Sequence, residues 1–165
     1  TVVWQITPDV KAIHKVLAAF SGLPHRLEFV REVDGVKYYD DSFGTTPQTA
    51  IVAMRALIQP QVLILGGSDK GLDFGPMIDE VVKDRTRHVI TIGQTGPKIE
   101  QMLRNHGFDK ITAGLDKMTD IVAEARRVAG PGDVVLLSTG CASFGLFHDY
   151  KDRGNQFKNA VNKLV

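Results

Sequence analysis

The sequence has few of the features that mark specialised classes of protein. It has one cysteine, Cys141, so no internal disulfide can form, and no Cys/His cluster has the spacing of zinc ligands. Its net charge of +1 gives no reason to expect binding to nucleic acid or to anionic membranes. No run is long and apolar enough to cross a membrane, and no secretory signal is visible. We therefore expect a cytoplasmic protein of ordinary globular composition.

Several catalytic and nucleotide-binding motifs are missing as well. The chain has no P-loop and no G-x-S-x-G motif, and the glycines of GGSDKG (66–71) have the wrong spacing for a dinucleotide fingerprint. The five histidines are scattered, and we expect His14 and His88 to be structural or solvent-facing. No histidine or asparagine stands out as a partner for Cys141, which predicts a buried, inert thiol.

The apolar pattern predicts a hairpin followed by alternating strands and helices. Residues 26–33 alternate apolar and polar side chains, Asp34-Gly35 is a hairpin turn signal, and residues 36–39 form the return strand. The first predicted helix, 9–20, has Thr7 as its expected N-cap and Pro8 as its first residue. The other predicted helices are 47–58, 74–84, 96–106, 116–129 and 151–164. The other predicted strands are 61–66, 88–92, 108–112 and 133–138.

Continuous apolar strands between amphipathic helices are typical of α/β proteins. We therefore predict a Rossmann-like, mostly parallel sheet with helices on both faces, preceded by a β-hairpin.

Polar loops rich in small residues follow three of these strands, at 40–46, 66–74 and 138–145. Each loop alone is equally well explained by turns and helix caps. The carboxyl ends of parallel strands share one edge of a sheet, however, so all three loops can converge on one ligand. After the first loop, the helix that opens at Pro47 offers free N–H groups that favour an anion. Lys70, in the second loop, strengthens the prediction of a binding site.

Five segments occur in an order and spacing typical of one family. They are GLPHRLEFV (22–30), DDSFGTTP (40–47), LILGGSDKGLDF (63–74), LLSTGCASF (136–144) and FHDYKDRGNQF (147–157). On these segments the chain resembles the C-terminal domain of the Mur ligases, ATP-dependent enzymes that add amino acids to the peptidoglycan precursor. The resemblance is closest to the member that adds D-glutamate to UDP-N-acetylmuramoyl-L-alanine, since the D-N-P-R signature of the diaminopimelate- or lysine-adding member is missing.

The resemblance implies a domain division and a set of ligands. Residues 22–165 would form the amino-acid-binding lid domain, and residues 1–21 a stub of the central ATPase domain that includes its terminal helix. ATP and Mg²⁺ would serve the full-length enzyme, with the metal ligands and most contacts to the UDP-linked substrate outside this chain. The isolated fragment would be an inactive monomer.

The resemblance also assigns site residues. The full-length enzyme would make an acyl phosphate from the precursor and ATP, and the amine of D-glutamate would attack it. D-Glutamate would be bound by Lys70, Ser143, Thr45 and Tyr150. ATP would be contacted by Arg26 and Asp41. No catalytic residue and no metal ligand is expected within this chain.

The chain departs from the family pattern in the first loop. Where the family usually has S-K-A-T-N, this sequence has S-F-G-T-T, so Phe43 replaces a lysine and Thr46 an asparagine. Thr46 can still cap the helix that begins at Pro47. Thr139-Gly140 also replaces the usual Pro-Ala of the third loop. These departures leave the true amino-acid specificity open.

Two alternatives from other classes remain open at this point. A receiver-like or flavodoxin-like regulatory module would use Asp40 and Asp41, but Asp69 is a poor phospho-acceptor within a Gly-rich turn, and no lysine follows a late strand. A free-standing nucleotide-binding module is disfavoured by the glycine spacing.

Overall fold

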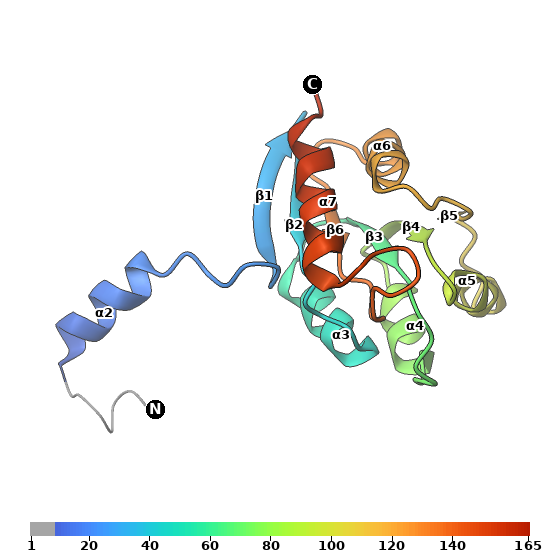
Figure 1. Ribbon diagram of the computed structural model, residues 1–165, viewed down its shortest axis with the longest axis horizontal. Coiled ribbons are helices and arrows are strands. Elements are labelled where there is room, and N and C mark those ends of the chain that lie inside the picture. Colours follow the sequence, from blue (N-terminus) through green and yellow to red (C-terminus); the bar gives the residue numbers. More distant parts are fainter. Residues whose placement is uncertain (1–8) are drawn as a thin grey trace.

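A six-stranded sheet forms the centre of the computed structural model, which describes residues 9–165 (Figure 1). The strand order is β1-β2-β6-β3-β4-β5, with β1 and β2 antiparallel and every other pair parallel. This is the mostly parallel α/β sheet, preceded by a hairpin, that the apolar pattern predicts. The strands are β1 (Glu28–Val33), β2 (Val36–Asp40), β3 (Gln61–Leu65), β4 (Thr86–Thr91), β5 (Ile111–Thr112) and β6 (Val134–Leu137).

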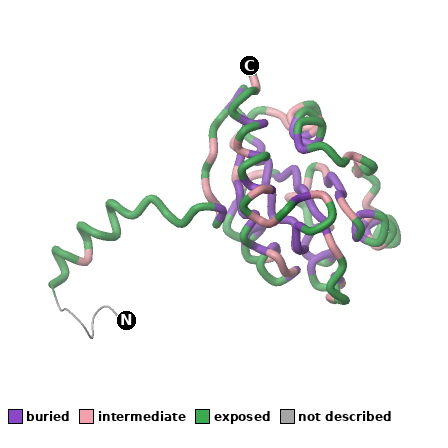
Figure 2. Tube along the Cα trace, in the orientation of Figure 1, coloured by how far each residue is buried: buried purple, intermediate pink, exposed green. Residues whose placement is uncertain are grey.

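Helices cover both faces of the sheet, as expected from strands that are apolar on both sides. Along β3, Val62 and Ile64 pack with the helices of one face, and Leu63 and Leu65 with those of the other. The first face carries α6 (Met118–Val128) and α7 (Tyr150–Asn162). The second carries α3 (Pro47–Ala56), α4 (Gly75–Val81) and α5 (Gly96–Asn105). Figure 2 shows the buried residues concentrated in the sheet between these layers.

One further helix, α2 (Val10–Ala19), lies apart from the sheet (Figure 1). Asp9 caps it by accepting hydrogen bonds from the N–H groups of Lys11 and Ala12, and none of its residues is buried. The helix was predicted, whereas the expected cap Thr7 and first residue Pro8 lie outside the described residues. Within residues 9–165, no helix combines the length and apolarity needed to span a membrane.

Most elements begin or end one to three residues away from the predicted bounds, and the strand predicted at 108–112 is confined to Ile111–Thr112. Two of these differences have a clear physical cause. The first strand begins at Glu28 rather than at residue 26, because His25 and Leu27 have φ angles of 61° and 45°, which no strand contains. Helix α4 ends at Val81 rather than at residue 84 because the chain turns after Val81 to enter β4. The carbonyl of Arg85 then accepts from the N–H of Gln61 at the point where β4 begins to pair with β3.

The hairpin turn has the conformation that its sequence indicates. Asp34 and Gly35 both have positive φ, at 53° and 76°, as a two-residue turn of type I′ requires. Its tip is packed as well: a Cβ at Gly35 would lie 3.2 Å from Pro131 Cβ. The turn therefore sets the register in which β1 pairs with β2.

We expect Gly35→Ala to lower the free energy of unfolding by about 1 kcal/mol, because alanine is strained at this φ. Gly35→Asn is the matched control, since asparagine adds the same Cβ beside Pro131 but tolerates positive φ. Urea denaturation should show a clearly smaller loss for asparagine. Equal losses would mean that contact with Pro131, and not backbone conformation, sets the cost.

Candidate functional site

The three polar loops meet at the carboxyl edge of the sheet because β6 lies between β2 and β3. Ser138 Oγ, after β6, donates to Asp41 Oδ2, after β2, at 2.7 Å. The N–H of Ser68, after β3, donates to the carbonyl of Ala142 at 2.9 Å. The convergence that the sequence predicts is thus confirmed, and the loops are hydrogen-bonded to one another.

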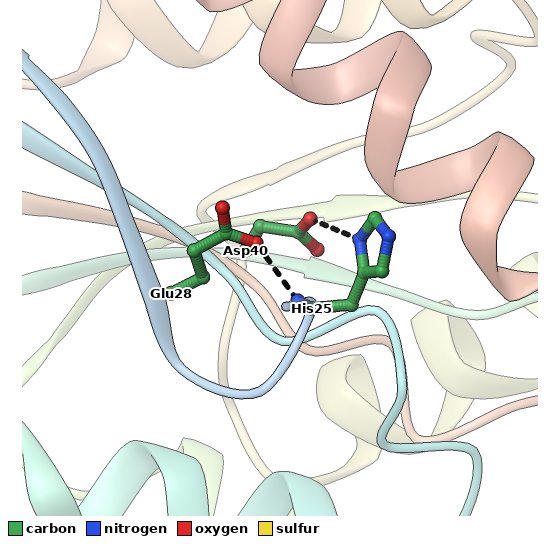
Figure 3. A group of neighbouring side chains, drawn as sticks. All are labelled: His25, Glu28 and Asp40. Atoms are coloured by element: carbon green, nitrogen blue, oxygen red, sulfur yellow. Dashed lines mark hydrogen bonds and ion pairs between the residues drawn. The ribbon is translucent and has the colours of Figure 1, made fainter. Parts of the chain in front are cut away.

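Asp40, at the end of β2, anchors the segment that leads into β1. Its Oδ2 lies 2.7 Å from His25 Nδ1, its Oδ1 accepts from the N–H of Ser42, and its side chain is fully buried (Figure 3). Glu28 accepts from the N–H of His25 at 2.8 Å and pairs with Lys158 at 3.0 Å. His25, Glu28 and Asp40 offer ligand atoms within 4.8 Å of one another. Hydrogen bonds and an ion pair already engage those atoms, so we assign the group a structural role.

Asp41 faces the other way and holds both neighbouring segments. The N–H of Leu27 donates to its Oδ1 at 3.0 Å, while Ser138 holds Oδ2. Burial raises the pKa of Asp41, although these two hydrogen bonds and the nearby Arg26 partly oppose the shift. The loop passes so close that a Cβ at Gly44 would lie 2.8 Å from Asp41 Oδ2. A larger residue at position 44 would therefore require the Asp41 carboxylate to shift.

A cleft of about 480 Å³ lies beside Asp41. Its polar lining includes Arg26 and Asp41, the two residues predicted to contact ATP. Its apolar lining includes Leu27 and, from α3, Val52 and Ala53. This volume is in the range of small-molecule sites, and an apolar wall with a few polar groups is their usual composition.

Three rings and a guanidinium form a contiguous group next to this cleft. The ring of Tyr150 meets those of His25 and Phe43 edge-on, with centroids 5.9 Å and 5.1 Å away. Arg26 Cζ lies 4.4 Å from the Phe43 centroid. The carbonyl of Tyr150 accepts from Ser42 Oγ at 2.8 Å. Tyr150, predicted to bind D-glutamate, therefore packs on the first loop, next to a predicted ATP residue.

The other residues predicted to bind D-glutamate occupy all three loops. Lys70 is exposed, and Ser143 is buried directly after the Ala142 that pairs with Ser68. Thr45 is half-buried at the end of the first loop. Within residues 9–165 no hydrogen bond joins Lys70, Ser143 and Thr45, so the structure places them on one edge without linking them directly. The next residue, Thr46, caps α3 as predicted, in a capping box with Thr49.

Arg153, on α7, is the residue at this edge that the sequence reasoning missed. It is fully buried, and its Nε and Nη2 donate to Ser42 Oγ and O at 2.8 Å. Its Nη1 donates to the carbonyl of Cys141 at 3.0 Å. Burial lowers the pKa of Arg153 to about 10, while Asp40 and Asp41 act in the opposite direction. One side chain thus connects the first and third loops.

The helical spacing of buried residues on α7 is a sequence signal that predicts the burial of Arg153. It lies four residues before Phe157 and eight before Val161, both fully buried on α7, so helical spacing places it on the core face. An arginine at such a position needs hydrogen-bond acceptors. The adjacent Gly154 lets α7 pack closely against the His25–Asp40 pair. A Cβ at residue 154 would approach His25 Nδ1 and Asp40 Oδ2 to well under 3.0 Å.

Cys141, His14 and His88 match their predicted surroundings. Cys141 is buried, its Sγ lies 3.3 Å from Thr95 Oγ1, and burial raises the pKa of its thiol. Its setting is therefore that of a structural thiol. His14 is exposed on α2, and His88 Nε2 bonds Thr112 Oγ1 at 2.8 Å.

Comparison with known proteins gives one consistent result. Residues 25–141 match the family described as Mur ligase, glutamate ligase domain. The chain is 43% identical over 155 residues to the UDP-N-acetylmuramoylalanine–D-glutamate ligase of Symbiobacterium thermophilum, covering 94% of this chain and 34% of that protein. It is 45% identical over 148 residues to the ligase of the same name from Pelotomaculum thermopropionicum, covering 90% and 32%. The chain thus spans about a third of the length of these curated relatives.

Solved structures show the same fold at low sequence identity. UDP-N-acetylmuramate-alanine ligase MurC from Thermotoga maritima aligns with a TM-score of 0.69 at 13% identity, over 98% of this chain and 35% of that chain. MurF ligase from Thermotoga maritima, in complex with ADP, aligns with a TM-score of 0.57 at 18% identity, over 89% and 33%. At these identities the likeness shows the fold alone.

Asp41→Asn tests the charge at the cleft. The pKa of Asp41 is higher in the folded protein than its ordinary value of 3.8 in the unfolded chain. Ionised Asp41 therefore destabilises the fold above the folded-state pKa, and this cost disappears below pH 3.8. Asparagine can still accept from Leu27 and donate to Ser138. We expect the variant to gain stability relative to the original as pH rises from about 3.8 to neutrality. Urea denaturation across this range measures the difference, with Asp84→Asn, at an exposed turn, as the charge control. A difference independent of pH would contradict the assignment.

Arg153→Lys tests the connection between the loops. The guanidinium donates from three separate nitrogens, whereas an ammonium carries all its N–H groups on one nitrogen at a different position. Buried acceptors on Ser42 and Cys141 therefore lose partners. We expect the free energy of unfolding to fall by about 2–4 kcal/mol. Lys151→Ala, exposed on the same helix, should change it by less than about 0.5 kcal/mol. Similar values for both variants in urea denaturation would show that Arg153 does not hold the loops.

Proposed function

The chain belongs to the Mur ligase family, and from this membership we propose that it is the glutamate ligase domain of an ATP-dependent enzyme of peptidoglycan precursor synthesis. The full-length enzyme would add D-glutamate to UDP-N-acetylmuramoyl-L-alanine. The observation that carries the proposal is the 43–45% identity, over at least 90% of this chain, to proteins named as that ligase. The family match leaves the receiver-like and nucleotide-binding alternatives without support.

We propose that residues 22–165 form the amino-acid-binding unit and that residues 1–21 belong to the ATPase domain before it. The described part of that segment, α2, supports this division, because its apolar residues Val16 and Leu17 are exposed and it buries nothing against the sheet. Residues 1–165 alone would then be inactive. We place the reaction in the cytoplasm, where ATP and UDP-linked precursors are made. The monomeric state stays a prediction.

The cleft beside Asp41 fits one end of ATP. Each carboxylate oxygen of Asp41 accepts one hydrogen bond within the protein and has capacity for another, so a ribose hydroxyl can donate to it. Arg26 provides a guanidinium for phosphate or ribose oxygens. The apolar wall from α3 can contact the base. From the family membership we propose that Mg²⁺ is held by residues outside this chain.

The other loops would position D-glutamate. Lys70 is exposed and forms no ion pair within residues 9–165, so its ammonium can bind a carboxylate of this dianionic amino acid. We propose that Ser143 and Thr45 add hydroxyl contacts and that the main chain of Tyr150 contacts the amino acid. The amine would attack the acyl phosphate carbon, lose a proton and displace phosphate as the amide bond forms. Positioning alone can supply much of the rate enhancement of such a step.

In the full-length enzyme, Lys70→Ala should raise the KM for D-glutamate by about tenfold or more, because a charge-assisted bond is lost. The KM for the UDP-linked substrate should stay unchanged. Lys70→Arg keeps the charge and should retain part of the affinity, and Lys163→Ala, directly after α7, is the control for removing an exposed lysine. Steady-state kinetics that leave the KM for D-glutamate unaltered would remove Lys70 from the site.

A further inference from the structure

We propose that Phe43 is a positioning residue for Arg26, holding its guanidinium at the cleft that Arg26 shares with Asp41. The proposal rests on the function proposed for Arg26 in binding ATP and deepens it. It gives a role to the residue at which the first loop departs most from the family pattern.

The contact between the two side chains is close. Arg26 Cζ lies 4.4 Å from the centroid of the Phe43 ring, well inside the distance at which an aromatic face attracts a cation. Within residues 9–165, the Arg26 guanidinium forms no ion pair and no hydrogen bond. Besides the longer-range attraction of the Asp41 carboxylate, the ring is therefore the contact in the described structure that can set the direction of this side chain.

The backbones that carry the two side chains are fixed to each other. The N–H of Phe43 donates to the carbonyl of His25 at 2.9 Å, and the N–H of Leu27 donates to Asp41. His25 and Leu27, on either side of Arg26, both have positive φ, which persists only where surrounding contacts enforce it. The Cα positions are thus set by the backbone, and the orientation of the guanidinium is left to the ring and to the charge of Asp41.

The ring itself is held by a neighbouring ring. Phe43 is 45% exposed, so burial does not fix it. Its contact with Tyr150, at 5.1 Å between centroids, and that of Tyr150 with His25, at 5.9 Å, provide the support. Because Tyr150 is among the residues proposed for D-glutamate, Phe43 contacts a member of each proposed ligand group.

A positioned arginine binds an anion with less loss of side-chain freedom than a mobile one. The ring thus prepares Arg26 for ATP before the nucleotide arrives. The chain has no lysine at position 43, and the aromatic ring that replaces it contacts the guanidinium of Arg26 instead.

The experiment combines kinetics of the full-length enzyme with NMR of residues 1–165. Phe43→Leu keeps an apolar side chain but removes the aromatic face, and we expect the KM for ATP to rise about two- to fivefold with kcat nearly unchanged. Phe43→Tyr should restore the original KM. In an Arg26→Ala background, Phe43→Leu should have no further effect. Phe29→Leu is the matched control, because Phe29 is 53% exposed and contacts Tyr39 edge-on without a cation.

The outcomes separate the inference from the function on which it rests. If Arg26→Ala leaves the KM for ATP unchanged, both fall. If Arg26→Ala raises it while Phe43→Leu does not, or if Phe43→Leu acts equally in both backgrounds, only the role of Phe43 falls. The Nε–H resonance of Arg26 gives a readout without ATP: the Phe43 ring current should shift it upfield, and Phe43→Leu should abolish the shift. An unmoved resonance would overturn the positioning role.

Discussion

A guanidinium inside a protein must be hydrogen-bonded, because burying an unpaired charge costs far more than a domain can tolerate. Arg153 meets this requirement through Ser42 and the carbonyl of Cys141. Those acceptors come from the loops after β2 and β6, so each loop must keep the shape that presents them. The placement of Asp41, Thr45 and Ser143 at the edge of the sheet depends on this one buried side chain.

The adjacent carboxylates Asp40 and Asp41 have different tasks because a strand end sends successive side chains in opposite directions. Asp40 turns inward to His25 and Ser42, where the missing side chain of Gly154 leaves room. Asp41 turns toward the cleft and keeps lone pairs for a ligand. Asp40 therefore maintains the geometry in which Asp41 can bind a ligand.

Much of this arrangement can be predicted from local sequence patterns. Runs such as QVLIL predict buried parallel strands, Asp34-Gly35 predicts the hairpin, and polar loops after strands predict the site edge. The contacts between distant residues cannot be obtained in this way. Arg153 and Ser42 are 111 residues apart, and His25 and Asp40 are 15 apart, so their pairing depends on how the elements pack. From the sequence, Phe43 is only the loss of a lysine. Its contact with Arg26 exists because the fold brings the two side chains together.

The position of β6 in the sheet has a consequence for the order of assembly. Its residues 134–137 lie between β2 and β3 and pair with both, although they come almost 70 residues after β3 in the chain. During synthesis from the N-terminus, β2 and β3 therefore have no common neighbour until nearly the whole domain has left the ribosome. Loop closure over such distances delays native pairing. The edge that carries the proposed ligand groups is thus completed late, by β6 and the helix α7 that follows it.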